Sequence, residues 1–348
     1  LWMEKAVRAL RPRLVVVLNF LRDQLDRSGE LETTAIRVGD ALRQLPEPST
    51  IVANVDDPIV WAHCEGLGGI VAVGIEADDF TLPRLPHSAD ARACPRCETS
   101  LQFDRVLLAH CGNYRCPNGD FGRPDPSMSV ARLQAPALDA LRLTMSDGCD
   151  LDVGVGGVYN AYNTALAYAA CRSLGLSSES IRDGLRSFEP KFGRQERMTL
   201  YGRPMRMLLA KNPAGFDEVL RTADELGGAH VYLIAVNDGI ADGRDVSWLW
   251  DVDFERLART PRRPVVVASG RRAQDLAVRL KYAGLPMDRL TVEPDPARAL
   301  ERVAGLGDAG DIPMILPTYT AMLDLRAVAE RAGAVAPFWR PRHQAATP

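Results

Sequence analysis

Four cysteines in a short stretch constrain this chain more than any other feature of its sequence. Two residues separate Cys94 from Cys97, thirteen follow, and Cys111 and Cys116 close the stretch. Two short cysteine loops supply four thiolates, enough to close a tetrahedral shell around Zn²⁺ and to leave no position for a substrate. We therefore expect a structural zinc ribbon inserted at about residues 88–126, with these four cysteines as ligands.

The composition is typical of a globular cytoplasmic protein. Of 348 residues, 46% are hydrophobic and 25% charged, and the formal net charge is −3. This mild acidity gives no electrostatic reason to expect a nucleic-acid partner. Seven cysteines, an odd number, fit a reducing compartment better than a disulfide framework. No apolar run is long enough to span a bilayer and no secretory signal is recognisable, so we expect a cytoplasmic chain without a transmembrane segment.

Apolar runs that alternate with amphipathic stretches predict an α/β fold. The first runs lie at residues 14–18, 51–54 and 70–73. Uninterrupted apolar runs of this length are typical of a parallel sheet buried on both faces. Helical patterns follow at about residues 158–174 and 178–186. These elements predict a first α/β domain, residues 1–198, interrupted by the ribbon.

A second group of apolar runs predicts a second α/β domain. Its members lie at residues 206–210, 231–236, 264–268 and 313–316. Helical stretches separate them at βαβ spacings, which indicates a Rossmann-like arrangement. We place this C-terminal domain at residues 199–348, with a flexible tail from about Arg340.

Several separated segments resemble motifs of the Mur ligase superfamily. The central-domain motifs match, in order, residues 19–29 (NFLRDQLDRSG), 54–58 (NVDDP), 158–163 (VYNAYN) and 192–197 (FGRQER). Together with the four-cysteine insertion and residues 211–215 (KNPAG) and 242–253 (DGRDVSWLWDVD), they are similar to the MurT branch of that superfamily. The resemblance covers nearly the whole chain and implies a Mur ligase-like central domain followed by a MurT-type ligase domain.

The resemblance also implies an activity. MurT-like proteins are ligase subunits of lipid II isoglutaminyl synthase, in which a glutaminase partner, GatD, supplies ammonia. The implied reaction is ATP-dependent amidation of the D-glutamate α-carboxylate in the peptidoglycan stem peptide, with Mg²⁺ as cofactor. ATP would convert the carboxylate to an acyl phosphate, which ammonia then attacks. Delivery from an adjoining glutaminase keeps that ammonia unprotonated.

By the same resemblance, several side chains lie where relatives bind the nucleotide. Asn160 and Asn163 would contact the adenine, since side-chain amides offer both a donor and an acceptor. Arg194 and Glu196 match the motif around the ribose and the domain hinge. Alternatively, the asparagines cap a helix, and Arg194 and Glu196 form a solvated ion pair without a ligand.

Asn54, Asp56 and Asp57 come directly after a predicted strand. Ligands commonly bind at that edge of an α/β sheet, and we count Asn54 and Asp57 among the candidate cofactor-binding residues. An Asp-Asp-Pro turn explains the same residues without a ligand. The sequence alone leaves both interpretations open.

The resemblance places an aspartate of the C-terminal domain in the partner's catalytic triad. In MurT-like proteins this aspartate orients the glutaminase histidine, which in turn serves the catalytic cysteine. Asp251 is our first candidate, with Asp245 and Asp253 as alternatives because spacing does not separate them. Alternatively, Trp248 and Trp250 anchor the segment and its aspartates merely solvate a loop.

The chain departs from the superfamily pattern at two places. Gln24 stands where many Mur ligases carry a magnesium-binding His, and MurT-like sequences also show Gln there. Relatives carry a phosphate-binding loop before the strand at residues 14–18, whereas this chain opens at Leu1. We therefore expect an N-terminally shortened form, with weak ATP turnover if nothing precedes Leu1.

Other interpretations of the sequence remain. The ribbon could bind nucleic acid, although Glu98 and Asp104 offset its arginines. The chain could be a folylpolyglutamate-type amino-acid ligase, or a non-catalytic remnant that still docks a glutaminase. His110 could replace one thiolate, but four cysteines already satisfy a tetrahedral zinc.

Overall fold

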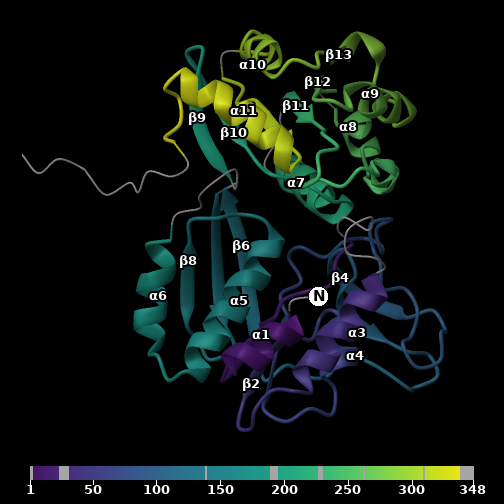
Figure 1. The fold of residues 1–348 in the computed structure, drawn as a ribbon, viewed down its shortest axis with the longest axis vertical. Helices are drawn as coiled ribbons and strands as arrows, with labels where there is room; N and C mark the ends of the chain where they lie inside the picture. Colours follow the sequence, from purple (N-terminus) through teal and green to yellow (C-terminus); the bar gives the residue numbers. More distant parts are fainter. Residues whose placement is uncertain are drawn as a thin grey trace, which may run out of the picture. The chain divides into compact units, whose positions relative to one another are not determined.

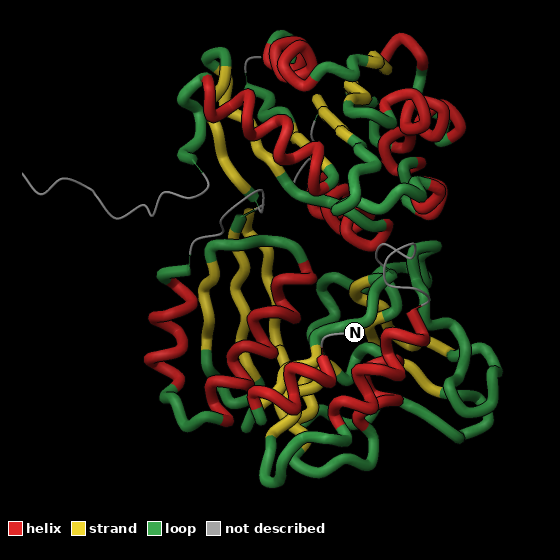
Figure 2. Tube along the Cα trace, in the orientation of Figure 1, coloured by secondary structure: helices red, strands yellow, loops and turns green. Residues whose placement is uncertain are grey.

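The chain folds into two compact units, residues 1–189 with 212–218 and residues 190–211 with 219–348. The computed structural model describes residues 3–22, 31–137, 139–188, 195–225, 230–261, 263–308 and 310–337. Arg194 and Gln24, both singled out above, lie outside the described residues. Each unit contains its own six-stranded sheet (Figures 1 and 2).

The sheet of the first unit has the strand order β1-β2-β3-β6-β7-β8. Neighbours from β1 to β6 run parallel, whereas β6, β7 and β8 pair antiparallel. The sheet is therefore mixed, and the parallel arrangement expected from the sequence holds for its first four strands. These strands are β1 (Leu14–Val17), β2 (Thr50–Asn54), β3 (Ile70–Ile75), β6 (Met128–Ala137), β7 (Ala140–Met145) and β8 (Asp150–Val153).

Helices cover both faces of this sheet because its central strands are apolar on both sides. Side chains alternate along a strand, so Val52 points into one core and its neighbours Ile51 and Ala53 into the other. Val52 shares its core with helix α5, and Ile51 and Ala53 share theirs with α3 and α4. The helices are α1 (Met3–Leu10), α3 (Leu31–Leu42), α4 (Pro58–Cys64), α5 (Val158–Ser173) and α6 (Ser178–Arg186).

A two-stranded antiparallel sheet is inserted between β3 and β6. It consists of β4 (Gln102–Leu108) and β5 (Cys111–Arg115), joined by the tight turn Ala109–His110. Ala109 has φ +49°, in the left-handed region that tight hairpins use. Loops before β4 and after β5 carry Cys94, Cys97 and Cys116, and these pack with Tyr114 and Phe121 in a small separate core.

The sheet of the second unit has the order β13-β12-β11-β14-β10-β9. All of its pairings are parallel except the hairpin of β9 and β10. β11, with every residue buried, lies between β12 and β14, as a strand covered on both faces should. The strands are β9 (Glu196–Leu200), β10 (Arg203–Met207), β11 (Val231–Ala235), β12 (Val265–Ser269), β13 (Leu290–Val292) and β14 (Met314–Pro317).

Helices connect the parallel strands of the second unit, as Figure 1 shows. They are α7 (Pro213–Glu225), whose residues up to Glu218 count with the first unit, η1 (Ser247–Asp251), α8 (Glu255–Arg259), α9 (Ala273–Tyr282), η2 (Met287–Arg289), α10 (Pro296–Ala304) and α11 (Tyr319–Arg331). Asp295 caps α10 by accepting the Arg298 N–H at 2.9 Å, and Pro296 opens that helix. Among the described residues of both units, no helix has the length and apolar character needed to cross a membrane.

Candidate functional site

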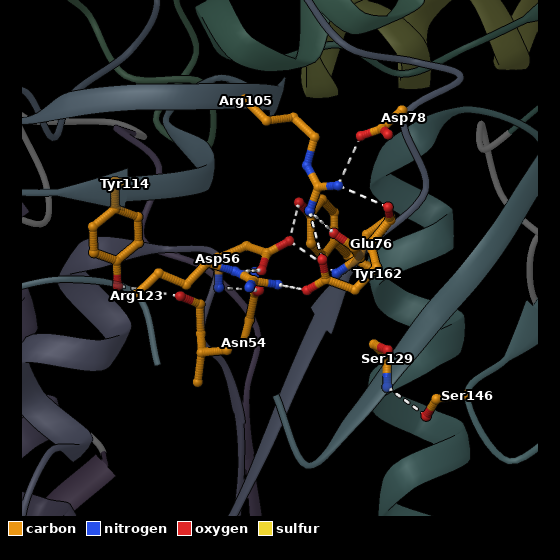
Figure 3. Close-up of polar contacts among 12 residues, drawn as sticks. Asn54, Asp56, Glu76, Asp78, Arg105, Tyr114, Arg123, Ser129, Ser146 and Tyr162 are labelled. Atoms are coloured by element: carbon orange, nitrogen blue, oxygen red, sulfur yellow. Dashed lines mark hydrogen bonds and ion pairs between the residues drawn. The ribbon is translucent and has the colours of Figure 1, made fainter. Parts of the chain in front are cut away.

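A buried polar cluster occupies the carboxyl end of β2 in the first unit (Figure 3). Its centre is Asp56, which is fully buried. One Asp56 oxygen accepts the Arg123 Nε–H at 2.7 Å, and the other accepts the Tyr162 hydroxyl at 2.7 Å and the Ile75 N–H at 3.0 Å. Three parts of the chain that are far apart in sequence therefore meet at one carboxylate: β3, α5 and the segment after β5.

Arg123 compensates the buried charge of Asp56. Its other arm donates to the Glu76 carboxylate at 2.6 Å, and its side chain is only 4% exposed. Burial disfavours the charged guanidinium, but Asp56 and Glu76 outweigh that effect and raise the pKa of Arg123. At Asp56, burial outweighs these partners and raises the pKa of the carboxyl. The ion pair of Arg123 with Asp56 fixes the segment after β5 to the end of β2.

Asp57, a predicted cofactor-binding residue, is fully buried and saturated with donors. Its Oδ1 accepts the Ile59 and Val60 N–H groups at 2.8 and 3.2 Å, which makes it the N-cap of α4, while its Oδ2 accepts the Phe20 N–H at 2.7 Å. Asn54, also fully buried, closes a turn by accepting the Asp56 N–H at 3.1 Å. These contacts match the turn alternative for Asn54 and Asp57, although both lie at the sheet edge where ligands bind in α/β folds.

His110, at the tip of the inserted hairpin, faces Asp57. The Asp90 N–H donates to His110 Nδ1 at 3.2 Å, and His110 Nε2 lies 3.4 Å from Asp57 Oδ1. Because Nδ1 accepts, a neutral imidazole carries its proton on Nε2, toward the carboxylate. Asp90 also pairs with Arg22 Nε at 2.9 Å. The hairpin tip is thereby connected to the segment that begins the first Mur ligase motif.

Asn160 and Asn163, predicted to contact the adenine, lie together on the first turns of α5. The Asn163 Nδ2 donates to the Asn160 Oδ1 at 3.2 Å, and the Asn160 Nδ2 donates to the Gly156 carbonyl at 2.7 Å. Both residues are half-buried. Their companion in the prediction, Arg194, falls outside the described residues.

Glu196 lies in the second unit, at the start of β9, and forms an ion pair with Arg326 of α11. Arg326 in turn donates to the Ala336 carbonyl at 3.1 Å. In this conformation the Glu196 carboxylate joins β9 to α11. The ion pair is more buried than the solvated pair considered from the sequence, since both side chains are less than 15% exposed.

The three candidate aspartates of the second unit lie in or beside the short helix η1. Asp245 is exposed and accepts the Ser247 N–H at 2.8 Å, a backbone hydrogen bond that lowers the pKa of Asp245. Asp253 pairs with Arg259 at 3.5 Å. Asp251, half-buried, is the last residue of η1.

Arg279 of α9 holds the backbone on both sides of Asp251. It donates to the Leu249 carbonyl at 3.1 Å and the Val252 carbonyl at 2.7 Å, and its guanidinium lies 5.5 Å from the Trp250 ring centroid. Buried arginine with paired carbonyls and a stacked aromatic is a rigid arrangement. The backbone that carries Asp251 is therefore fixed from within the unit.

The predicted cysteine ligands divide between two places. The sulfurs of Cys94, Cys97 and Cys116 all lie within 4.8 Å of one another. Cys111 instead groups with Asp57 and His110, fully buried in the main core. The four-sulfur shell expected from the sequence is thus corrected to a three-sulfur cluster.

The surroundings of Cys111 also disfavour a role as a thiolate ligand. Burial, and then the charges of Asp57 and Asp56, raise the pKa of Cys111 well above its ordinary value, so it stays a neutral thiol. The Asp57 and His110 atoms beside it fit no metal either: Asp57 already accepts three N–H groups, and the Asp90 N–H fixes the His110 proton on Nε2.

Sequence reasoning missed Arg123 and the part that Tyr162 has in the cluster. Tyr162 lies between Asn160 and Asn163, within a Mur ligase motif, and this position could have marked it as a candidate site residue. Arg123 lies 67 residues from Asp56, and no local pattern connects the two. Only the folded ribbon brings this arginine back to the sheet.

Comparison with known proteins finds relatives named MurT. The model of the MurT ligase C-terminal family matches residues 209–322. Two relatives are named lipid II isoglutaminyl synthase (glutamine-hydrolyzing) subunit MurT. The one from Staphylococcus aureus is 30% identical over 318 residues, covering 91% of this chain and 70% of the relative. The one from Streptococcus pneumoniae is 31% identical over 322 residues, with the same two shares.

Solved structures share the fold at lower identity. A pseudomurein peptide ligase type C from Methanothermus fervidus superposes with a TM-score of 0.72 at 20% identity, over 94% of this chain and 65% of that one. MurF from Acinetobacter baumannii gives 0.62 at 14% identity, over 93% and 62%. These matches establish the Mur ligase-like α/β fold. Together with the identity to the two MurT subunits, they show that the chain belongs to the MurT family.

Proposed function

We propose that this chain is the ligase subunit of a lipid II isoglutaminyl synthase. It would use ATP and Mg²⁺ to amidate the D-glutamate α-carboxylate of the peptidoglycan stem peptide. The observation that carries the proposal is the match to two MurT subunits over 91% of the chain, because it includes both units described above.

The proposed chemistry requires activation of a carboxylate, which is a poor acyl donor. ATP transfers its terminal phosphoryl group to the substrate carboxylate, and the acyl phosphate then loses phosphate as ammonia forms the new C–N bond. Charge develops on the transferring phosphoryl oxygens, so positioned cations and backbone donors contribute most of the catalysis. Mg²⁺, when bound, would supply such a cation.

We assign different tasks to the two polar groups of the first unit. Asn160 and Asn163 present amide edges at the start of α5 and would contact the adenine of ATP. Asn54 and Asp57 are buried in a turn and a helix cap, with their oxygens engaged. We therefore assign them to shaping the sheet edge beside the nucleotide, and not to direct coordination of Mg²⁺.

Ammonia would come from a GatD-like glutaminase, with an aspartate of this chain completing its triad. Asp251 is the preferred candidate because Arg279 fixes the carbonyls of residues 249 and 252 on either side of it. A triad aspartate must be held rigidly to keep its histidine in one tautomer.

The test is to co-express the chain with a GatD-like glutaminase and to follow amidation of lipid II by mass spectrometry. The Asp251→Asn complex should lose amidation driven by glutamine but retain amidation driven by ammonium salts at raised pH. Asp245→Asn is the matched control and should behave like the wild type. Unchanged glutamine use by the Asp251→Asn complex would remove Asp251 from the triad.

A further inference from the structure

Helix α5 carries the two asparagines assigned to the adenine, yet its N-cap residue provides no cap. Gly157 stands at that position with φ +87°, a conformation that residues with a side chain rarely adopt. A Cβ there would also lie 2.6 Å from the Tyr159 ring. Because glycine has no side-chain oxygen, the N–H groups of the first turn need an acceptor from another part of the chain.

Glu218 of α7 supplies this acceptor. Its Oε1 accepts the Val158 N–H at 2.8 Å, although the two residues are 60 positions apart in the sequence. Glu218 is only 3% exposed, and residues 212–218 count with the first unit, as α5 does. A carboxylate also suits the partial positive charge at the N-terminus of a helix. Glu218 therefore caps α5 in place of the N-cap residue.

The cap holds the same backbone that orients the first asparagine. In the peptide group between Gly157 and Val158, both polar atoms are bound. Glu218 accepts the N–H of this group, and its carbonyl accepts the Asn160 N–H at 2.9 Å. The preceding carbonyl, that of Gly156, accepts the Asn160 Nδ2–H at 2.7 Å. By holding this peptide group, Glu218 fixes the backbone to which the Asn160 amide is bound.

A second hydrogen bond passes this orientation on to Asn163. With its nitrogen directed at the Gly156 carbonyl, the Asn160 amide presents its oxygen to Asn163, whose Nδ2–H it accepts at 3.2 Å. That bond in turn determines which side of the Asn163 amide is the oxygen. Within the described part of the chain, these bonds leave the Asn163 oxygen and its second N–H for a ligand.

An amide held in one orientation discriminates between purines. Adenine presents an amino donor beside a ring-nitrogen acceptor, which matches an amide oxygen beside an amide N–H. Guanine has a carbonyl where adenine has its amino group, so the same amide would set oxygen against oxygen. An asparagine that is free to flip accommodates either base. The fixed orientation is therefore what would make the contact selective.

We propose that Glu218 is a positioning residue that makes the nucleotide site selective for adenine. It acts through the α5 cap and the Asn160 amide, and its role needs no contact with the base itself. The inference rests on the proposed adenine contact of Asn160 and Asn163 and extends it to a buried carboxylate of α7.

Titration calorimetry of the purified chain with Mg²⁺-ATP and with Mg²⁺-GTP tests this proposal. The wild type should prefer ATP. Glu218→Leu removes the acceptor, so the preference should fall about tenfold, mostly through weaker ATP binding. Glu218→Gln retains an accepting oxygen and should keep a preference close to that of the wild type. Glu179→Leu removes an exposed carboxylate from the first turn of α6 and is the matched control, expected to change nothing.

Hydrogen exchange at the Val158 amide separates loss of the cap from loss of the adenine contact. This amide should exchange faster in Glu218→Leu and near the wild-type rate in Glu218→Gln. Unchanged exchange in Glu218→Leu, or an unchanged ATP preference once exchange is fast, would overturn the role of Glu218 alone. If Glu218→Leu does not fold, Glu218→Asp, one methylene too short for the bond, faces the same two criteria.

The proposed adenine contact and the proposed ligase activity have separate readouts. Equal binding of ATP and GTP by the wild type would overturn the adenine contact, and this inference with it. A complex that fails to amidate lipid II while the chain still prefers ATP would count against the ligase activity and not against Glu218.

Discussion

Asp56 and Asp57 are neighbours in the chain, yet each stabilises a different part of the first unit. Asp56 binds Arg123 and the Tyr162 hydroxyl, whereas Asp57 caps α4 and accepts the Phe20 N–H. Both carboxylates are fully buried, so each needs its donors to offset the loss of hydration. Removing a donor should therefore cost more than removing an exposed ion pair.

The first prediction concerns Arg123. Arg123→Met leaves the Asp56 charge buried without its main partner and should destabilise the first unit by about 3 to 5 kcal/mol. Hydrogen exchange of the slowest amides in β2 and β3 measures this. The double variant Asp56→Asn with Arg123→Met should recover part of the loss. Arg142→Ala, which breaks an exposed pair with Asp152, should change little; an equal loss there would contradict the argument.

The second prediction separates the two tasks of Asp57. Asp57→Ala should cost about 1 to 2 kcal/mol through loss of the α4 cap. Asp57→Ser restores a capping oxygen, so amide exchange within α4 should return toward the wild-type rate. The Phe20 amide should stay fast in both variants, because serine is too short to reach it. Slow exchange at Phe20 in the Ser variant would show that the carboxylate does not hold that segment.

The sequence predicted contacts between individual residues only where those residues belong to one continuous motif. Asn160 and Asn163 were expected together and lie together, because residues three apart on a helix are neighbours. The partner of Asp56 could not be predicted, since Arg123 returns to the sheet only through the inserted hairpin. The prediction of Cys111 as a metal ligand was wrong for a similar reason. The spacing from Cys111 to Cys116 fits a metal-binding loop, but residues 111–115 form the strand β5.

At the scale of elements, the short helix η1 depends on one buried side chain of α9. Arg279 donates to two carbonyls and to the Glu255 carboxylate at 2.8 Å, and it lies between the rings of Trp250 and Phe254. Burial raises the pKa of Glu255, but the hydrogen bond from Arg279 outweighs it, so the pKa of Glu255 is lowered. The segment 247–255 thus forms one unit with α9.

The third prediction tests that dependence. Arg279→Met should raise the pKa of Glu255 to or above its ordinary value and speed amide exchange through residues 247–255. The pair stabilises the fold most above the ordinary pKa of Glu255, and its contribution is lost as pH falls through the lowered pKa. NMR titration of the Glu255 carboxyl reports this directly. Arg289→Met, an exposed control in the same unit, should leave both readouts unchanged, and an unaltered Glu255 titration in Arg279→Met would refute the coupling.

Elements with regular periodicity were predictable, and a bulged strand was not. The helices expected at about residues 158–174 and 178–186 are α5 and α6 to within a residue. β6 was missed because a shift of register between Val130 and Arg132 breaks the alternation of its buried residues. Its antiparallel pairing with β7, and that of β7 with β8, give the sheet its mixed character.

At the scale of the whole molecule, the proposed activity divides between two polypeptides. The MurT relatives are named as subunits, and the chain covers 70% of their length. Its two units carry the features that the proposal needs: polar residues at strand and helix ends in the first, and the rigid aspartate segment in the second. The two candidate activities therefore differ in their nitrogen source. The proposed complex uses ammonia from glutamine, whereas an amino-acid ligase acting alone adds an intact amino acid.

Isotope transfer from glutamine into lipid II shows whether the complex amidates its substrate with nitrogen taken from glutamine. The co-expressed complex would receive ATP, Mg²⁺, lipid II and glutamine labelled with ¹⁵N at the side-chain amide, in the presence of unlabelled ammonium. Labelled D-isoglutamine is expected in the stem peptide, formed only when both subunits and ATP are present. Unmodified lipid II with an active glutaminase, or addition of an intact amino acid in place of the amide, would contradict it.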